Sequence, residues 1–214
     1  IIDRGDIVND YTYRVLNSFE REIKRRIASQ NQITSTLLGQ ILYVGIMVII
    51  FTAYLLLFRR DYFDKPRSIA MLYVLLTLFP VVLSLFMRHN FMSVYIIPFA
   101  MVPMFVRVFM DSRTAFTTHV IMVMICAAAV KYQYEFIIIQ LTAGFVAIYS
   151  LRELLRRAQV FKTALLVAVS SVVVYLSLQM MQDNDFMKMD HEMNVHFAVN
   201  GVLLLLAYPL MYII

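Results

Sequence analysis

The histidines and acidic residues near the end of the chain are the first candidates for chemistry. His191, Glu192 and His196 are similar to part of a zinc protease site, in which two histidines lie one helical turn apart and a glutamate acts as base. Here the histidines are five positions apart, which places them about 140° apart around a helix. They do not share a face, so the sequence argues against a zinc site of this type.

The segment around these histidines, MQDNDFMKMDHEMN, is rich in acidic residues and methionine. Its carboxylates fit a hard cation, and its thioethers together with a histidine fit a soft one. A solvated loop outside the membrane is the alternative that we adopt, because charge runs are usually solvated. The potential ligands are Asp183, Asp185, Met187, Met189, Asp190, His191 and Glu192.

An arginine and an aspartate lie in the apolar stretch PFAMVPMFVRVFMDSRTAF, which runs from Pro98 to Phe116. Arg107 precedes Asp111 by four positions, which on one helix places both on the same face. We expect an ion pair there, with the arginine reaching toward the membrane surface. The alternative is a switch, in which Pro98 and Pro103 allow part of the helix to tilt.

Three further polar residues, His119, Gln140 and Asn200, lie within apolar runs. In lipid such side chains usually form hydrogen bonds with a neighbouring helix, and we expect this role rather than ligand binding. The sequence contains no glycine-rich phosphate loop, nucleophile elbow, cysteine pair or convincing carboxylate dyad. We therefore expect no catalytic, cofactor-binding or metal-binding residue in this segment.

The composition indicates an all-α integral membrane protein. Hydrophobic residues make up 61% of the chain and charged residues 15%, with a mean hydropathy of +0.74. A soluble domain has roughly a quarter charged residues and under half apolar ones. The net charge of +5 does not indicate nucleic-acid binding, because the basic residues gather at the ends of apolar segments. The single cysteine, Cys126, excludes an internal disulfide.

Seven apolar runs approach the roughly 20 residues that a spanning helix needs. The fourth and fifth are short, and either could be re-entrant. Paired small residues, Ala143 with Ala147 and Ala164 with Ala168, predict close approach between helices. The predicted spans are residues 33–58, 68–87, 92–110, 114–130, 136–151, 163–180 and 195–214.

The sequence predicts two parts. Residues 1–31 form the end of an extracellular domain and a connecting helix, and residues 32–214 form the seven-helix transmembrane domain. We expect two short extended pieces within residues 1–8, followed by an amphipathic helix from Asp10 to about Gln30. A helix lying on the membrane surface is the alternative for that helix. Because the chain starts without methionine and ends on apolar residues, we expect a piece of a longer protein.

Lysines and arginines concentrate in alternate connections, at residues 59–67, 107–113 and 152–162. The positive-inside rule then places these connections and the C-terminus in the cytoplasm, and the N-terminus outside. Basic residues before the first span oppose this orientation, but a translocated domain largely escapes the rule. We expect the inner face to be anchored to anionic lipid by basic residues. These are Arg59, Arg60, Arg152, Arg156 and Arg157.

Four stretches in a fixed order carry a family resemblance: RGDIVNDYTYRVLNSF, PMFVRVFMDSRTAF, SLRELLRRAQVFKTAL and NGVLLLLAYPLMYII. Over its whole length the chain resembles the bacterial seven-transmembrane receptors with an intracellular HD hydrolase domain, the PgpH-like proteins. The resemblance implies a multi-pass protein of the bacterial inner (cytoplasmic) membrane, with an extracellular sensor domain before this segment. It also implies a cytoplasmic HD phosphohydrolase after it, similar to enzymes that open cyclic di-AMP. The divalent metal and its ligands would belong to that HD domain, and no residue here matches them.

The resemblance implies a transmembrane signalling domain that couples an outer sensor to the hydrolase. As the mechanism we hypothesise a shift between two packings, which moves the cytoplasmic end of the last span. The expected partners are the lipid bilayer, the protein's own outer and cytoplasmic domains and an unidentified external ligand. A second copy of the chain is a further candidate partner. The alternative function is a transporter or channel domain, which would need ionisable residues from several helices around one cavity. A purely structural anchor for the hydrolase is the third hypothesis.

Overall fold

The computed structural model describes residues 10–89, 93–151, 157–182, 191–206 and 209, and within these it consists of helices and their connections. The all-α fold class is thereby confirmed. The chain divides into two compact units, residues 1–46 and 47–214, which we describe separately. The extended pieces predicted within residues 1–8 lie outside the described residues.

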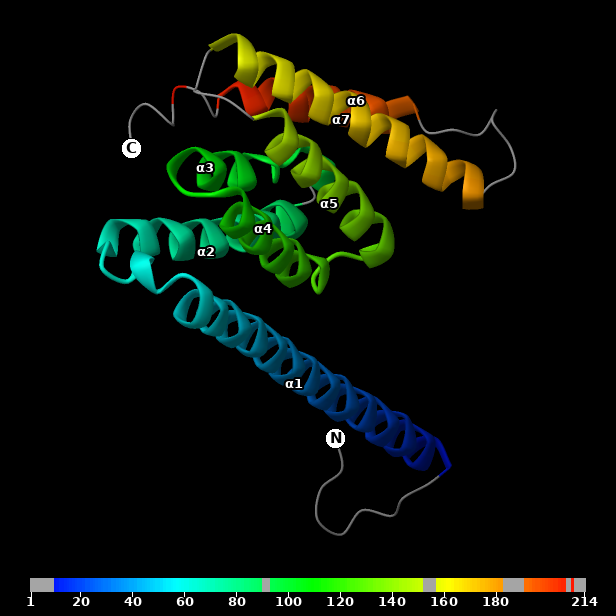
Figure 1. Ribbon diagram of the computed structural model, residues 1–214. Helices are drawn as coiled ribbons and strands as arrows, with labels where there is room; N and C mark the ends of the chain where they lie inside the picture. Colours follow the sequence, from blue (N-terminus) through cyan, green and yellow to red (C-terminus); the bar gives the residue numbers. More distant parts are fainter. Residues whose placement is uncertain (1–9, 90–92, 152–156, 183–190, 207–208, 210–214) are drawn as a thin grey trace. The chain divides into compact units, whose positions relative to one another are not determined.

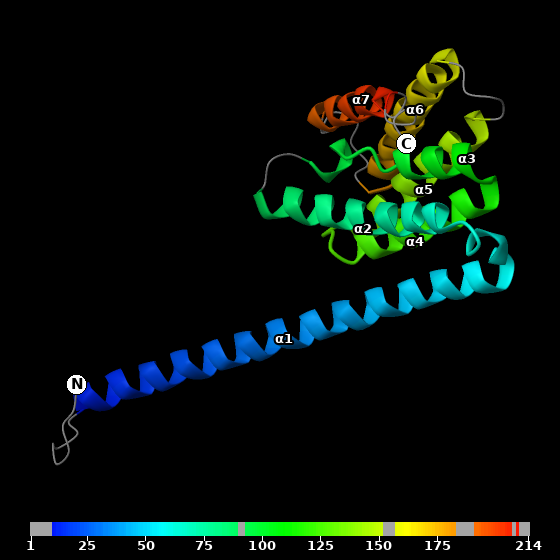
Figure 2. The ribbon, with the colours of Figure 1, turned by 90° about the vertical axis from the view of Figure 1, so that its left-hand side faces the viewer.

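The first unit contains most of helix α1, which runs from Asp10 to Phe58 and ends in the second unit. Figures 1 and 2 show α1 as one uninterrupted helix. The sequence predicted two helices meeting near residue 31, and this separation is wrong. No proline or glycine lies between Asp10 and Thr34, so nothing in the local sequence ends the helix there.

The second unit contains the other helices, and Figure 1 shows α6 beside both α5 and α7. Within the described residues, three helical segments are long and apolar enough to cross a membrane: Thr34–Phe58, Pro66–Arg88 and Gln159–Met181. The elements after α1 are η1 (Arg60–Tyr62), α2 (Pro66–His89), η2 (Val94–Ile96), α3 (Met101–Phe109), α4 (Ser112–Ala127), α5 (Gln133–Ser150), α6 (Arg157–Gln182) and α7 (His191–Leu205).

The third predicted span, residues 92–110, is not one helix, and this prediction is wrong. Its first part is the short 3-10 helix η2, after which Ile97 is extended, with φ −65° and ψ 124°. The residue before a proline is disfavoured in the α conformation, so Pro98 explains the break. Pro103 lies in the first turn of α3, where its missing N–H breaks no helical hydrogen bond.

Aromatic rings from several elements fill the centre of the second unit. The Tyr95 ring contacts those of Phe136 and Phe197, at centroid distances of 6.3 and 5.5 Å. Phe99 meets Phe136 edge to face at 5.3 Å. The segment just before α3 is therefore packed between α5 and α7.

Small residues bring α6 and α7 close together, as the alanine pairs predicted. A Cβ added to Gly201 on α7 would lie 2.9 Å from the Cβ of Ala168 and 3.6 Å from the carbonyl oxygen of Ala164. Both alanines belong to α6. The close approach predicted for this pair is confirmed, and it requires glycine on the facing helix.

Candidate functional site

A cluster of polar side chains joins the end of α1 to the turn between α3 and α4. Its members are Arg59, Tyr62, Asp111 and Thr114, and we refer to them as the Asp111 cluster. Asp111 is the N-cap of α4, and its carboxylate accepts hydrogen bonds from the backbone N–H groups of Arg113 (3.1 Å) and Thr114 (3.4 Å). An aspartate at this position satisfies donors that have no partner within the helix.

The same carboxylate binds the α1–α2 connection. Asp111 Oδ1 accepts from the Tyr62 hydroxyl at 2.8 Å and from the Thr114 hydroxyl at 2.6 Å. Asp111 Oδ2 accepts from Arg59 Nη2, which forms an ion pair with it. The Arg59 guanidinium also lies 5.9 Å from the centroid of the Tyr62 ring. One carboxylate thus links residues about fifty positions apart in the chain.

Hydrogen bonds and a positive charge in the Asp111 cluster favour the ionised form of the carboxylate. Partial burial favours the neutral acid, but the hydrogen bonds from Thr114 and Tyr62 outweigh it, so the pKa of Asp111 lies below its usual value. The positive charge of Arg59 lowers the pKa further. Burial raises the pKa of Tyr62, and its hydrogen bond to Asp111 adds to that shift.

The expected ion pair between Arg107 and Asp111 does not form. Helix α3 ends at Phe109, so the two residues do not lie on one helix, and Arg59 is the partner of Asp111. Arg107 is half-buried, and its Nε has no hydrogen-bond partner among the described residues. Spacing along the chain predicted the wrong partner because the chain turns at Met110, whose φ and ψ are −135° and −126°.

A buried histidine joins α4 to α5. His119 Nε2 lies 2.8 Å from the backbone carbonyl oxygen of Gln140 and donates to it. The His119 ring fits because position 144 is glycine, where an added Cβ would lie 2.1 Å from His119 Cδ2. The glycine therefore allows the ring to reach a carbonyl that a larger side chain would cover. The Gln140 side chain is also buried.

A buried asparagine joins α7 to the segment before α3. Asn200 Nδ2 donates to the carbonyl oxygens of Tyr95 at 2.8 Å and Ile97 at 2.9 Å. The carbonyls are available because this segment is not α-helical. The break before Pro98 thus creates the acceptors that position α7.

Replacing Asn200 by alanine should destabilise the second unit. It removes two buried hydrogen bonds, and interhelical hydrogen bonds in membranes average about 0.6 kcal/mol each, so we expect a loss of about 1–2 kcal/mol. Thermal unfolding of the purified protein in a neutral detergent would measure it. Gln133→Ala, which removes an exposed amide at the start of α5, is the control. Equal behaviour of the two variants would contradict the role given to Asn200.

The structure describes only some of the other residues of the predicted basic anchor and of the acidic, methionine-rich segment, which we interpreted as a solvated loop. Arg60 is exposed in η1, and Arg157 is the first residue of α6. The acidic, methionine-rich segment lies mostly in residues 183–190, outside the described residues, and so do Arg152 and Arg156. Among the described residues, no group of His, Cys, Asp and Glu side chains could hold a metal ion.

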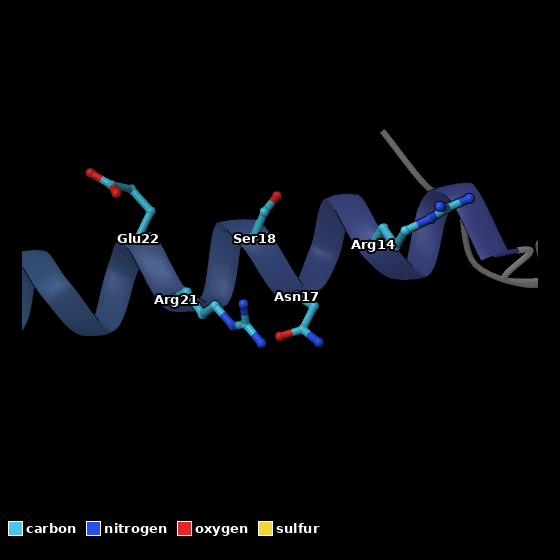
Figure 3. A pocket seen from close by; sticks show the side chains of 5 residues that line it. All are labelled: Arg14, Asn17, Ser18, Arg21 and Glu22. Atoms are coloured by element: carbon cyan, nitrogen blue, oxygen red, sulfur yellow. The ribbon is translucent and has the colours of Figure 1, made fainter.

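A hollow along the first unit does not form a site. It is lined by Arg14, Asn17, Ser18, Arg21 and Glu22 on a single exposed helix. Figure 3 shows Ser18 and Glu22 on one side of α1, and Asn17 and Arg21 on the other with their ends near each other. The Ser18 hydroxyl donates to the carbonyl of Val15, and Arg14 Nε donates to that of Asp10. The Ser18 and Arg14 side chains therefore form hydrogen bonds within their own helix.

Sequence reasoning missed Tyr62, Thr114 and Gly144. Asp111 directly before the helical run from Ser112 is a recognisable N-cap signal, and it could have identified the turn. Gly144, in the middle of an apolar run, could have indicated close approach of another group. No local pattern connects Tyr62 to Asp111, because that contact depends on packing.

Comparison with known proteins identifies a family for this chain. A family model described as "7TM receptor with intracellular HD hydrolase" matches residues 34–214. Neither the curated proteins nor the solved structures contain a significant match to the chain. The matched region begins in the apolar part of α1 and includes every later helix.

Proposed function

This chain belongs to the family of seven-transmembrane receptors with an intracellular HD hydrolase, and from that premise we propose that it regulates a cyclic di-AMP phosphodiesterase. Membership makes the chain a transmembrane signalling domain of a membrane protein. The proposal adds the substrate, a sensor domain outside a bacterial inner membrane and a hydrolase on the cytoplasmic side. The extent of the family match, which includes α7, carries the signalling role, whereas the substrate rests on the resemblance to the PgpH-like proteins.

The proposed mechanism is a shift between two packings of the helices. A ligand bound outside could favour one packing only if its affinity for the two differs. Helix α7 would carry the shift, and its hydrogen bonds from Asn200 to the segment before α3 would have to change with it. The Asp111 cluster would hold the cytoplasmic ends of α1 and α4 together in at least one packing.

No observation favours the transporter or channel alternative. Such a domain would direct ionisable or polar groups from several helices into one cavity. His119 and Asn200 instead donate to backbone carbonyls of neighbouring elements. The donor atoms His119 Nε2 and Asn200 Nδ2 are thus engaged in contacts between helices.

The test is cyclic di-AMP hydrolysis by the full-length parent protein in proteoliposomes. We expect metal-dependent hydrolysis that a chelator abolishes and a divalent cation restores. We also expect Asn200→Ala to change the rate about fivefold or more, the usual size of coupling between sites, whereas Gln133→Ala leaves it unchanged.

The outcomes of that test separate the hypotheses on the substrate, on coupling through α7 and on a purely structural anchor. Hydrolysis of other cyclic dinucleotides but not of cyclic di-AMP would contradict the substrate and leave the signalling role standing. An unchanged rate in Asn200→Ala, with the protein folded and its melting temperature lowered, would contradict coupling through α7. The structural-anchor hypothesis would then be preferred.

A further inference from the structure

A cleft on the second unit has a basic end and apolar walls. It lies where α3 ends, α4 begins and α5 ends, and has a volume of about 380 Å³. Figures 1 and 2 both show these three helices next to one another. Arg107, Ser112 and Arg113 supply the polar and charged part of the lining, to which we refer as the polar end. The volume falls within the roughly 300–1,000 Å³ typical of small-molecule sites.

The positive charge at the polar end is not neutralised within the described residues. Asp111, the nearby carboxylate, forms its ion pair with Arg59 and accepts further hydrogen bonds from Tyr62 and Thr114. Arg107 is half-buried, and among the residues that the structure describes its Nε has no hydrogen-bond partner. A buried donor without a partner costs free energy, so a ligand that accepts from it would be favoured.

The walls of the cleft are apolar and open to the outside of the bundle. Phe116 of α4 stacks on Phe145 of α5 with ring centroids 4.9 Å apart. These two rings are 37% and 42% exposed, and Tyr149 beside them is 67% exposed. In a membrane domain such exposed rings face lipid, with the tyrosine near the headgroup level.

We propose that this cleft binds an anionic phospholipid. Its phosphate would lie between Arg107 and Arg113, and one acyl chain would follow the wall formed by Phe116 and Phe145. The charge of the polar end is complementary to a phosphate, and guanidinium groups bind phosphate oxygens with two parallel hydrogen bonds. A free phosphate would leave the apolar wall unused, which is why the lipid is the preferred occupant. Basic pockets between helices on the cytoplasmic side commonly bind such headgroups.

The site is distinct from the general basic anchor of the inner face. That anchor would depend on basic residues that attract any anionic surface and lose their effect in salt. The cleft would retain an individual lipid molecule, because it combines a half-buried arginine with an apolar wall.

Native mass spectrometry of the purified chain in neutral detergent tests the proposal, with phosphatidylglycerol as the probe. We expect one retained lipid, and binding about tenfold weaker in Arg107→Gln/Arg113→Gln than in the wild type. Arg88→Gln removes an exposed charge near the end of α2, outside the cleft and outside the basic anchor, and should leave binding unchanged. Phosphatidylcholine tests the need for net negative charge, and glycerol 1-phosphate tests whether a soluble phosphate suffices.

Further variants separate loss of the site from loss of folding. Arg107→Lys keeps the positive charge but lacks the planar guanidinium that forms two parallel hydrogen bonds. This variant should bind the lipid with intermediate affinity. Phe145→Ala should weaken the binding of phosphatidylglycerol and leave the binding of glycerol 1-phosphate unaffected. The proposal would be overturned by an equal loss of binding in Arg88→Gln. Equal retention of phosphatidylcholine, or full competition by glycerol 1-phosphate, would also overturn it. Unchanged lipid binding in Arg107→Gln/Arg113→Gln would overturn it as well.

Discussion

Replacing Asp111 by alanine should lower the free energy of unfolding of the second unit by about 2–4 kcal/mol. Loss of the N-cap of α4 accounts for about 1 kcal/mol. The Tyr62 and Thr114 hydroxyls would also lose a charged acceptor, and because part-buried hydroxyls can rotate to other partners, we assign about 1.5–3 kcal/mol to the two bonds together. The ion pair with Arg59 adds little, because both side chains keep over a fifth of their surface exposed.

The matched control is Asp64→Ala, which removes an exposed carboxylate from the α1–α2 connection. Thermal unfolding in neutral detergent, followed by circular dichroism, should show a clearly lower midpoint for Asp111→Ala alone. Asp111→Asn should have an intermediate effect, since asparagine is also a good N-cap but carries no charge. If Asp64→Ala and Asp111→Ala are equally stable, the Asp111 cluster does not hold the two connections together.

The Asp111 cluster should also make stability depend on pH in a defined direction. The folded-state pKa of Asp111 is lowered, so its contribution is present above the ordinary carboxyl pKa of about 4 and is lost as pH falls through the folded-state value. The pKa of Tyr62 is raised by burial and by the bond to Asp111. Its contribution is present below about pH 10 and is lost as pH rises through the raised value. Asp111→Asn should remove the acid-side dependence that this residue causes.

Replacing Gly144 by alanine should be the most damaging single-methyl change in the second unit. The added Cβ would lie 2.1 Å from His119 Cδ2 and 2.2 Å from His119 Nε2, far inside van der Waals contact. The ring is buried and cannot turn into solvent, so either the hydrogen bond to Gln140 breaks or α4 and α5 separate. Overpacking of this kind costs about 1–3 kcal/mol, to which the lost hydrogen bond adds about 1 kcal/mol.

Gly45→Ala is the matched control, because an added Cβ there meets no atom within 4 Å. It lies inside α1, where alanine is favoured over glycine, so this variant should be neutral or slightly stabilising. A double-mutant cycle gives the decisive measurement. In a His119→Ala background, Gly144→Ala should cost much less than in the wild type, since the clashing ring is gone. An equal cost in both backgrounds would show that the clash with His119 is not the cause.

The sequence alone determined that this is an all-α membrane protein, because apolar composition and run length are local properties. The helical runs at α2, α4, α5 and α6 were predictable for the same reason. The close approach of α6 and α7 was predictable from Ala164 and Ala168, since small residues are needed wherever helices in a membrane touch. The continuity of α1 was missed because the change from polar to apolar residues near position 31 was interpreted as an interruption, although helix formation does not depend on polarity.

Only the tertiary structure decided which polar groups meet. Spacing within a helix pointed from Asp111 to Arg107, but the turn after α3 separates them, and packing brings in Arg59 from 52 positions away. The cleft beside Arg107 likewise depends on α5 ending next to the start of α4. Residue spacing describes contacts inside one element, whereas contacts between elements depend on the order and angle of packing. That packing is set jointly by positions such as Gly144, Asn200 and Pro98, whose effects combine only in the folded chain.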